Sequence, residues 1–198
     1  TAADVDASPI TVTVTATAAD GAVDDGFTMT ITSPPEVVGA GIGPQTATEE
    51  TTFTLDISGF FVDPDIDPMT FTATGLPSSL TMSPAGVITG NPTNDEAFDP
   101  GNPFSVTVTA TAADGTVDDM FLLTVQNVND QPIITGQMPN PIVVDEDLTV
   151  LLQVTDLVIA DPDITDTHTL TISPPGPDDN FTVVGANITP APDFNGSL

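Results

Sequence analysis

The stretch PFSVTVTATAADGTVDDMFLLTV, residues 103–125, contains the pattern that decides the fold class. Apolar residues occupy the even positions from 104 to 112, and Ser or Thr occupies the odd positions between them. Such a period of two is typical of a β-strand with one buried face. The segment AADG then predicts a hairpin turn, and MFLLTV predicts the returning strand. The sequence therefore predicts an all-β protein built of short strands.

The same pattern occurs earlier in the chain, which indicates an internal repeat. Residues 9–31, PITVTVTATAADGAVDDGFTMTI, align with residues 103–125 at a constant offset of 94 residues, and about two-thirds of the positions are identical. A looser match joins residues 47–67 to residues 144–165. A period of about 95 residues is the size of one β-sandwich domain.

This period divides the chain into three segments. Residues 1–33 are expected to be the last two strands of one repeat, residues 34–131 a complete domain, and residues 132–198 the front of a further repeat. Two arrangements remain open for the partial segments. The chain is a window on a longer covalent array, which we favour, or neighbouring copies complete each other's half domains. Both arrangements predict a fibre or stalk of stacked sandwiches.

The charge balance excludes several classes of function. The 198 residues include 29 Asp and Glu, one His and no Lys or Arg, for a formal net charge of −29. Binding to nucleic acid or to anionic membranes depends on Lys and Arg, so neither is expected. No apolar run approaches the ~18 residues of a membrane span, and the absence of Cys excludes a disulfide framework. The abundance of Val, Ile and Thr favours a folded chain over a disordered one.

Two aspartate-rich segments recur at domain spacing, GFFVDPDIDPMTF at residues 59–71 and VIADPDITDTHTL at residues 158–170. Their aspartates alternate along extended backbone, so neighbouring carboxylates lie on one side and repel. Calcium takes six to eight oxygen ligands from carboxylates and carbonyls, whereas zinc and copper favour thiolate or imidazole. The segments therefore predict bound Ca²⁺. The alternative is that these aspartates are turn formers with solvated side chains.

Residues 75–93, GLPSSLTMSPAGVITGNPT, followed by VTVTATAADG, resemble the dystroglycan-type cadherin-like domain, also called the putative Ig domain of bacterial surface proteins. The motifs VDEDL, ADPDITD and NITPAPDFNGSL in residues 132–198 resemble the cadherin-like tandem repeats of large bacterial adhesins. The resemblance implies tandem Ig-like or cadherin-like Greek-key β-sandwiches. It also implies an extracellular location and calcium at the junctions between repeats.

The cadherin ligand pattern implies a set of calcium ligands in this chain. The linker NVNDQP, residues 127–132, gives the fullest match. The linker TSPPEVVGAG, residues 32–41, has no Asn-Asp pair and implies a weaker or differently built site. The implied ligands are Glu49, Asp63, Asp65, Asp95, Glu96, Asp114, Asn127, Asn129, Asp130, Asp161 and Asp163, with Asp4, Asp20 and Glu146 as counterparts in the flanking segments.

Other polar residues do not indicate catalysis, so the chain is not expected to be an enzyme. His168, within the alternating segment THTLTI, is expected to be a solvent-facing strand residue, and no nucleophile motif surrounds a Ser. The acidic pairs at positions 24–25 and 118–119 are expected to be solvated hairpin residues. Glycosylation stays open, because three sequons begin at Asn180, Asn187 and Asn195.

The expected function is structural or adhesive. The chain is expected to be a calcium-stiffened repeat module of a secreted bacterial surface adhesin or extracellular filament. Its expected partners are neighbouring repeats or copies of itself, with glycans as a further candidate. The alternative is a non-catalytic spacer or carbohydrate-binding module of a secreted polysaccharide-degrading enzyme. Sugar binding on sandwiches usually uses exposed Trp or Tyr, and the chain has neither.

Overall fold

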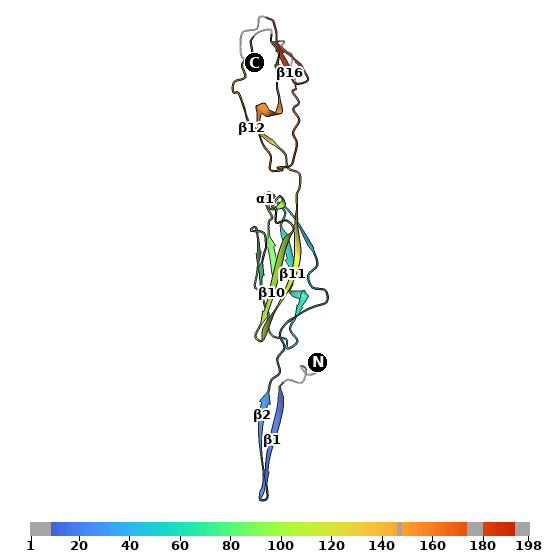
Figure 1. Cartoon of the computed structure of the whole chain (residues 1–198), viewed down its shortest axis with the longest axis vertical. Helices are drawn as coiled ribbons and strands as arrows, with labels where there is room; N and C mark the ends of the chain where they lie inside the picture. Colours follow the sequence, from blue (N-terminus) through green and yellow to red (C-terminus); the bar gives the residue numbers. More distant parts are fainter. Residues whose placement is uncertain (1–8, 146–147, 174–179, 193–198) are drawn as a thin grey trace. The chain divides into compact units, whose positions relative to one another are not determined.

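The computed structural model describes residues 9–145, 148–173 and 180–192, and the chain divides after Val128 into two compact units. Nearly all regular elements of both units are strands (Figure 1), so the predicted all-β fold class is confirmed. In the described parts of the chain, no helix is long and apolar enough to cross a membrane. The partition into three repeat segments stays a prediction.

One layer of the sandwich in the first unit is a four-stranded sheet with the strand order β4-β11-β10-β7. Its members are β4 (Gln45–Thr48), β7 (Thr70–Thr74), β10 (Phe104–Ala112) and β11 (Gly115–Gln126). The strands β7, β10 and β11 are antiparallel neighbours, whereas β4 runs parallel to the end of β11. Ala112 pairs with Gly115 across the turn, so the predicted hairpin is confirmed.

The second layer consists of a three-stranded sheet with the order β5-β9-β8 and a two-stranded pair, β3 with β6. The chain passes from one layer to the other after β3, β4, β6, β7 and β9, in keeping with the predicted Greek-key sandwich. The elements are β3 (Glu36–Val37), β5 (Phe53–Asp56), η2 (Ser58–Phe60), β6 (Phe61–Val62), β8 (Leu80–Met82), β9 (Val87–Gly90) and α1 (Asn94–Ala97).

The core of this sandwich is built on the apolar face of β10. Val106 and Val108 are 0% exposed, as the alternating pattern predicts, and Ile88 of the other layer is also 0% exposed. The rings of Phe61 and Phe71 pack with their centroids 5.5 Å apart and a tilt of 57°. Each such buried side chain contributes about 1.5–3 kcal/mol to stability.

The strands β1 (Ile10–Ala18) and β2 (Gly21–Met29) form a two-stranded antiparallel hairpin with the register of β10 and β11. The two hairpins therefore share the same backbone pairing, but their equivalent side chains differ in burial. Phe27 is 52% exposed, whereas its counterpart Phe121 is 3% exposed. In the described residues, no second layer covers the apolar face of this hairpin.

The unit after Val128 repeats one layer of the sandwich. Its pair β12–β14 corresponds to β3–β6, and its sheet β13-β16-β15 corresponds to β5-β9-β8. Its elements are β12 (Ile133–Gln137), β13 (Val150–Leu151), η3 (Val154–Asp156), β14 (Leu157–Ala160), β15 (Phe181–Val184) and β16 (Asn187–Pro190). Across its described residues, the unit has no counterpart of the four-stranded sheet.

The strand predicted at residues 167–172 does not form, so this prediction is wrong. Its counterpart in the first unit is β7, which pairs only with β10. No equivalent of β10 occurs in the described part of the second unit. The segment therefore has an alternating sequence but no neighbouring strand with which to form hydrogen bonds.

Candidate metal centre

The first aspartate-rich segment forms a tight loop after β6. Asp63 is 5% exposed, and its Oδ1 accepts hydrogen bonds from the backbone N–H groups of Asp65 at 2.9 Å and Asp67 at 3.0 Å. Its second oxygen, Oδ2, is buried and accepts no hydrogen bond. Ile66 in the same loop has a φ of 64°, which is rare for a β-branched residue. Strained backbone around a buried, incompletely bonded carboxylate is typical of binding loops.

Asp114, in the turn between β10 and β11, belongs to the same cluster of carboxylates. Both of its carboxylate oxygens are buried and have no hydrogen-bond partner. Burial raises the pKa of Asp114 above its usual value, and the negative charges of Asp63, Asp65 and Asp67 raise this pKa further. Because the chain contains no Lys or Arg, no such side chain can balance this cluster.

The carboxylate cluster also holds the linker that enters the sandwich. Asp65 accepts a hydrogen bond through Oδ2 from the backbone N–H of Ser33, at 2.6 Å. Ser33 lies three residues before β3 begins. Gly115, next to Asp114, approaches Pro34 so closely that a Cβ at position 115 would lie 2.7 Å from the Pro34 Cβ. The loop, the hairpin turn and the linker therefore meet at one end of the sandwich.

The second aspartate-rich segment repeats this geometry in the other unit. Asp161 accepts the N–H of Asp163 through Oδ1 at 3.0 Å, as Asp63 accepts that of Asp65. Asp163 is 2% exposed and accepts the N–H of Asp130, which lies three residues before β12. The remaining oxygen of Asp163, Oδ1, is buried without a hydrogen-bond partner. Both loops thus bind a linker amide and leave buried carboxylate oxygen unbonded.

His168 occupies a place that its sequence context did not predict. Its Nε2 lies 2.6 Å from Oδ2 of Asp161, and its side chain is 25% exposed. The expectation of a solvent-facing strand residue is wrong, because the segment forms no strand and the imidazole turns to a nearly buried carboxylate. His168 is the single histidine of the chain and has no counterpart in the first loop, where Met69 follows Asp67 by two residues.

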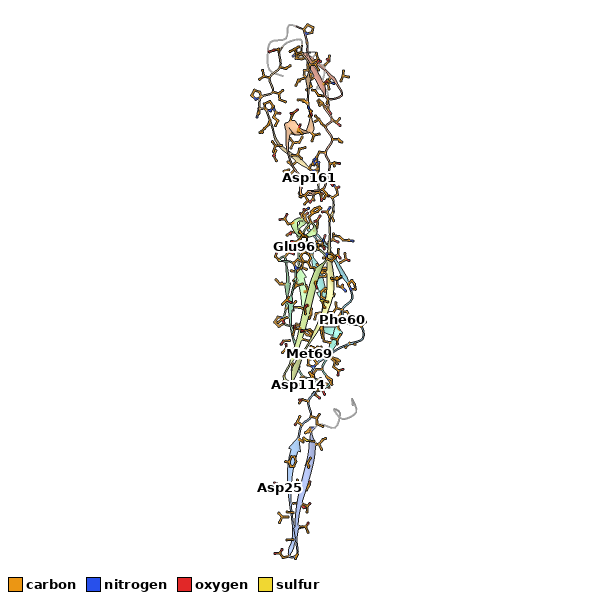
Figure 2. All side chains as sticks on the ribbon, in the orientation of Figure 1. Asp25, Phe60, Met69, Glu96, Asp114 and Asp161 are labelled. Carbon is orange, nitrogen blue, oxygen red and sulfur yellow. The ribbon has the colours of Figure 1, made fainter. Side chains whose placement is uncertain are left out.

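A second group of predicted ligands lies at the other end of the same sandwich, near α1; Figure 2 places Glu96 and Asp114 at opposite ends. Glu96 is 7% exposed. Its oxygens accept four hydrogen bonds, from Ser78 Oγ at 3.0 Å, Ser79 N at 2.9 Å, Ser79 Oγ at 2.5 Å and Thr93 N at 3.0 Å. Burial acts to raise the pKa of Glu96, but these hydrogen bonds outweigh it and hold the pKa below its usual value.

The other predicted ligands are placed without converging on either carboxylate loop. Glu49, 2% exposed, accepts the N–H of Val128 at 2.6 Å. Asp95, Asn127 and Asn129 are exposed, and Asn129 donates through Nδ2 to the carbonyl of Asp130 at 3.0 Å. Asp4, Glu146 and Asn195 lie outside the described residues. Asp67 joins the first cluster although it was not in the predicted ligand set.

The donor set fits a hard cation. Within residues 9–145, 148–173 and 180–192, no group of three or more Asp, Glu or His side chains is placed so that it could hold a metal ion. However, the unbonded oxygens of Asp63 and Asp114 are buried among uncompensated negative charges. All candidate donors there are oxygens, which Ca²⁺ accepts at ~2.3–2.6 Å in flexible geometry.

The raised pKa of Asp114 gives the first prediction. Because the folded-state pKa lies above the unfolded value, the folded state binds this proton more tightly, and stability falls as pH rises from about 3.8 through the raised pKa. With a chelator present at pH 7, Asp114→Asn is expected to raise the midpoint of thermal unfolding. The advantage should vanish at pH 3, where the carboxyl group is protonated in both states.

Calorimetry of the two chains across this pH range measures the effect. The matched control is Asp20→Asn, which removes the same charge from the exposed turn of the β1–β2 hairpin. An equal gain from Asp20→Asn would show that only the total charge matters. A loss of stability from Asp114→Asn in chelator would contradict the repulsion between these carboxylates.

Comparison with known proteins identifies the sandwich. Residues 35–126 match the family model described as "Putative Ig domain", so this segment belongs to that family of Ig-like domains, and the resemblance seen in residues 75–93 is confirmed. A search of curated proteins found no match.

Several solved structures are similar to the chain. They include an endo-fucoidan hydrolase, MfFcnA4, from glycoside hydrolase family 107, with 22% identity over 93% of this chain and 30% of that chain and a TM-score of 0.42. A putative alpha-galactosidase from Bacteroides fragilis has 21% identity over 48% of this chain and 18% of that chain, with a TM-score of 0.37. Extracellular domains 3–5 of Drosophila OTK have 14% identity over 59% of this chain and 39% of that chain, with a TM-score of 0.42. The match therefore spans well under two-thirds of each of these chains.

Proposed function

We propose that this chain is a structural module of a bacterial surface adhesin or extracellular filament, in which Ca²⁺ stiffens the entry of the linker into each Ig-like unit. The observation that carries the proposal is the carboxylate loop found in both units, with a buried oxygen that has no hydrogen-bond partner on Asp63 and on Asp163. Repetition of this loop at domain spacing argues against isolated turn-forming aspartates.

The loops connect cation binding to the order of the linker. In the first unit, Asp63, Asp65, Asp67 and Asp114 would hold the ion. In the second unit, Asp161 and Asp163 would hold it, with Asp130 at the linker. The bound ion would supply positive charge among carboxylates that otherwise repel. Because Asp65 and Asp163 also bind linker amides, fixing these side chains fixes the adjoining backbone.

Glycan binding within a secreted polysaccharide-degrading enzyme remains the alternative function. The chain offers neither Trp nor Tyr as a stacking platform. The carboxylate loops also have no evident use in binding a neutral sugar without an ion. The structural role therefore accounts for more of the described features, and no catalytic role is proposed for this segment.

The test is thermal unfolding of the chain in calcium and in chelator at equal ionic strength. Affinities of extracellular calcium modules are ~10⁻⁴–10⁻³ M, so ~10 mM Ca²⁺ should stabilise the fold by about 1.4–2.7 kcal/mol. This corresponds to a rise in melting temperature of about 6 to 20 °C for a domain of this size. Magnesium should have a smaller effect, because it demands near-octahedral geometry and dehydrates reluctantly.

Asp114→Asn provides the decisive variant in the same measurement. It should lose most of the calcium-dependent rise in melting temperature, although it is more stable than the parent chain in chelator. Asp20→Asn should keep the full rise. The proposal fails if calcium has no more effect than an equal ionic strength of NaCl, or if Asp114→Asn responds to calcium like the parent chain.

A further inference from the structure

An open groove of about 530 Å³ lies between β7 and β8 in the first unit. This volume falls within the range of about 300–1,000 Å³ that is typical of ligand sites. Its apolar lining includes Phe71 and Leu80, each 5% exposed, and the half-buried Ala73, Leu76 and Met82. None of the lining residues is charged, although the chain carries 29 Asp and Glu. The groove is therefore an apolar feature of a strongly acidic chain.

One border of the groove is the outer edge of β7. Among the described residues, only β10 pairs with this strand. Phe71 donates its N–H to the carbonyl of Pro84 at 3.1 Å, so its main-chain groups point away from β10. Main-chain groups alternate in direction along an antiparallel strand, so the N–H and C=O of Ala73 point the same way. No described segment forms a hydrogen bond with these two groups.

The other border of the groove is the outer edge of β8, the last strand of the second layer. Ser83 donates its N–H to the carbonyl of Val87 at 2.8 Å, toward β9. By the same alternation, the main-chain groups of Met82 point away from β9. Two open strand edges with apolar side chains between them thus border the groove. Unpaired edges of this kind are templates for pairing with another chain.

We propose that this groove binds an extended peptide of basic character from a partner protein, which adds an antiparallel strand to the outer edge of β7. The main chain of the peptide bonds the N–H and C=O of Ala73. Every second side chain of the peptide enters the groove and packs against Leu76 and Met82. This is recognition by strand addition, in which main-chain hydrogen bonds supply affinity and the groove selects the alternate side chains.

Charge selects the partner. The chain has a formal net charge of −29 and no Lys or Arg, so it attracts a basic peptide, whereas a second copy of the chain is repelled. Carboxylate also lies near one end of the groove, where Ser78 and Ser79 donate hydrogen bonds to Glu96 (Figure 2). Asp95, next to Glu96, is exposed and can meet a Lys or Arg of the peptide.

The inference goes beyond the proposed function and does not depend on it. No residue that lines the groove belongs to the carboxylate loops. Peptide binding is therefore measured in chelator, where its failure would leave the calcium proposal untouched. Failure of calcium binding would likewise leave the groove as it is.

Fluorescence anisotropy of a labelled peptide, acetyl-Lys-Val-Thr-Val-Thr-Val-Lys-amide, tests the proposal on the whole chain. Saturable binding is expected, with an affinity that falls as NaCl is added. A peptide with Pro in place of the central Val lacks the N–H that faces β7, and its affinity should fall at least about 10-fold. A peptide with Gln in place of both Lys should bind at least about 3-fold more weakly.

Two proline variants of the protein locate the contact. Ala73→Pro removes an N–H that points away from β10, so it costs no bond of the β7–β10 ladder and should weaken binding at least about 10-fold. Thr54→Pro is the matched control on β5, the opposite edge of the other sheet. Ile57 bonds Gly86, on the β9 side, so by alternation the N–H of Thr54 points away from β9. This variant should bind the peptide like the parent chain.

Hydrogen exchange followed by NMR gives a readout on the unmodified chain, in case Ala73→Pro does not fold. The amide of Ala73 should exchange more slowly when the peptide is bound. The proposal is overturned by no saturable binding at about 1 mM peptide, by an unchanged Ala73 amide, or by equal effects of Ala73→Pro and Thr54→Pro. Equal binding of the Gln peptide would also overturn it. So would protection of Ala73 by a neutral oligosaccharide or by self-association in place of the peptide.

Discussion

Phe121→Asp is expected to abolish the cooperative unfolding transition of the sandwich in residues 35–126, whereas Phe27→Asp, at the equivalent position of the repeat, leaves that transition in place. Phe121 is 3% exposed and belongs to the core cluster. Removing a buried Phe costs about 3–5 kcal/mol, and an unpaired carboxylate in the same place costs several kcal/mol more. Together these losses approach or exceed the ~5–15 kcal/mol that stabilise a typical domain.

Circular dichroism and calorimetry of dilute protein measure this difference, since the chain has no Trp or Tyr for intrinsic fluorescence. The two variants add the same charge to the same local sequence, so only the surroundings of the side chain differ. Phe27 is 52% exposed, and its replacement should shift the transition of the sandwich by less than about 0.5 kcal/mol. Equal effects of the two substitutions would contradict the assigned difference in burial.

This matched pair also shows how far local pattern predicts structure. The alternation in residues 104–112 correctly predicts a strand and its buried face. The nearly identical alternation in residues 10–18 correctly predicts a strand, yet that strand has no covered face in the described structure. Periodicity reports which face a strand would bury, but the covering layer comes from residues far away in sequence.

Two local predictions failed for the same reason. Residues 167–172 have the composition and period of a strand, but without a neighbouring strand they remain irregular. Asp119 was expected to be solvated, but its Oδ2 accepts the N–H of Ile42 at 2.6 Å, because the loop before β4 covers the inward face of β11. In both cases the structure of a residue depends on a segment distant in sequence, which the local pattern of alternation does not include.

The candidate site was predictable in part. The alternating aspartates identified both loops, because the carboxylate at the first position can bond the amide two residues later. The electrostatic coupling of Asp67 to Asp114 could not be read from sequence, since 47 positions separate them. Nor could the sequence show that protein donors surround Glu96, a residue that the cadherin ligand pattern had placed among the implied calcium ligands.

Glu96→Ala is expected to destabilise the sandwich by about 3–5 kcal/mol, the second large effect. The substitution leaves four donors at this end without their acceptor. A hydrogen bond to a charged group contributes about 1.5–3 kcal/mol net, and the four are not additive because water reaches some of the freed donors. It also opens the capping box that begins α1 at Thr93. Glu96→Gln should lose less, because the amide keeps one acceptor oxygen.

Chemical denaturation of these variants in calcium and in chelator separates a structural role of Glu96 from a ligand role. If the four hydrogen bonds are its whole function, the loss from Glu96→Ala is the same under both conditions, and the exposed neighbour Asp95→Ala changes little. A loss of stability that is larger in calcium than in chelator would instead make Glu96 a ligand. A loss below about 1 kcal/mol would show that water replaces the carboxylate.

The pKa of Glu96 is lower in the folded state than its usual value of 4.5. The contribution of this carboxylate to stability is therefore present above about pH 4.5 and is lost as pH falls through the lowered folded pKa. The difference between parent and Glu96→Ala should therefore shrink in acid, opposite in sign to the pH dependence expected at Asp114.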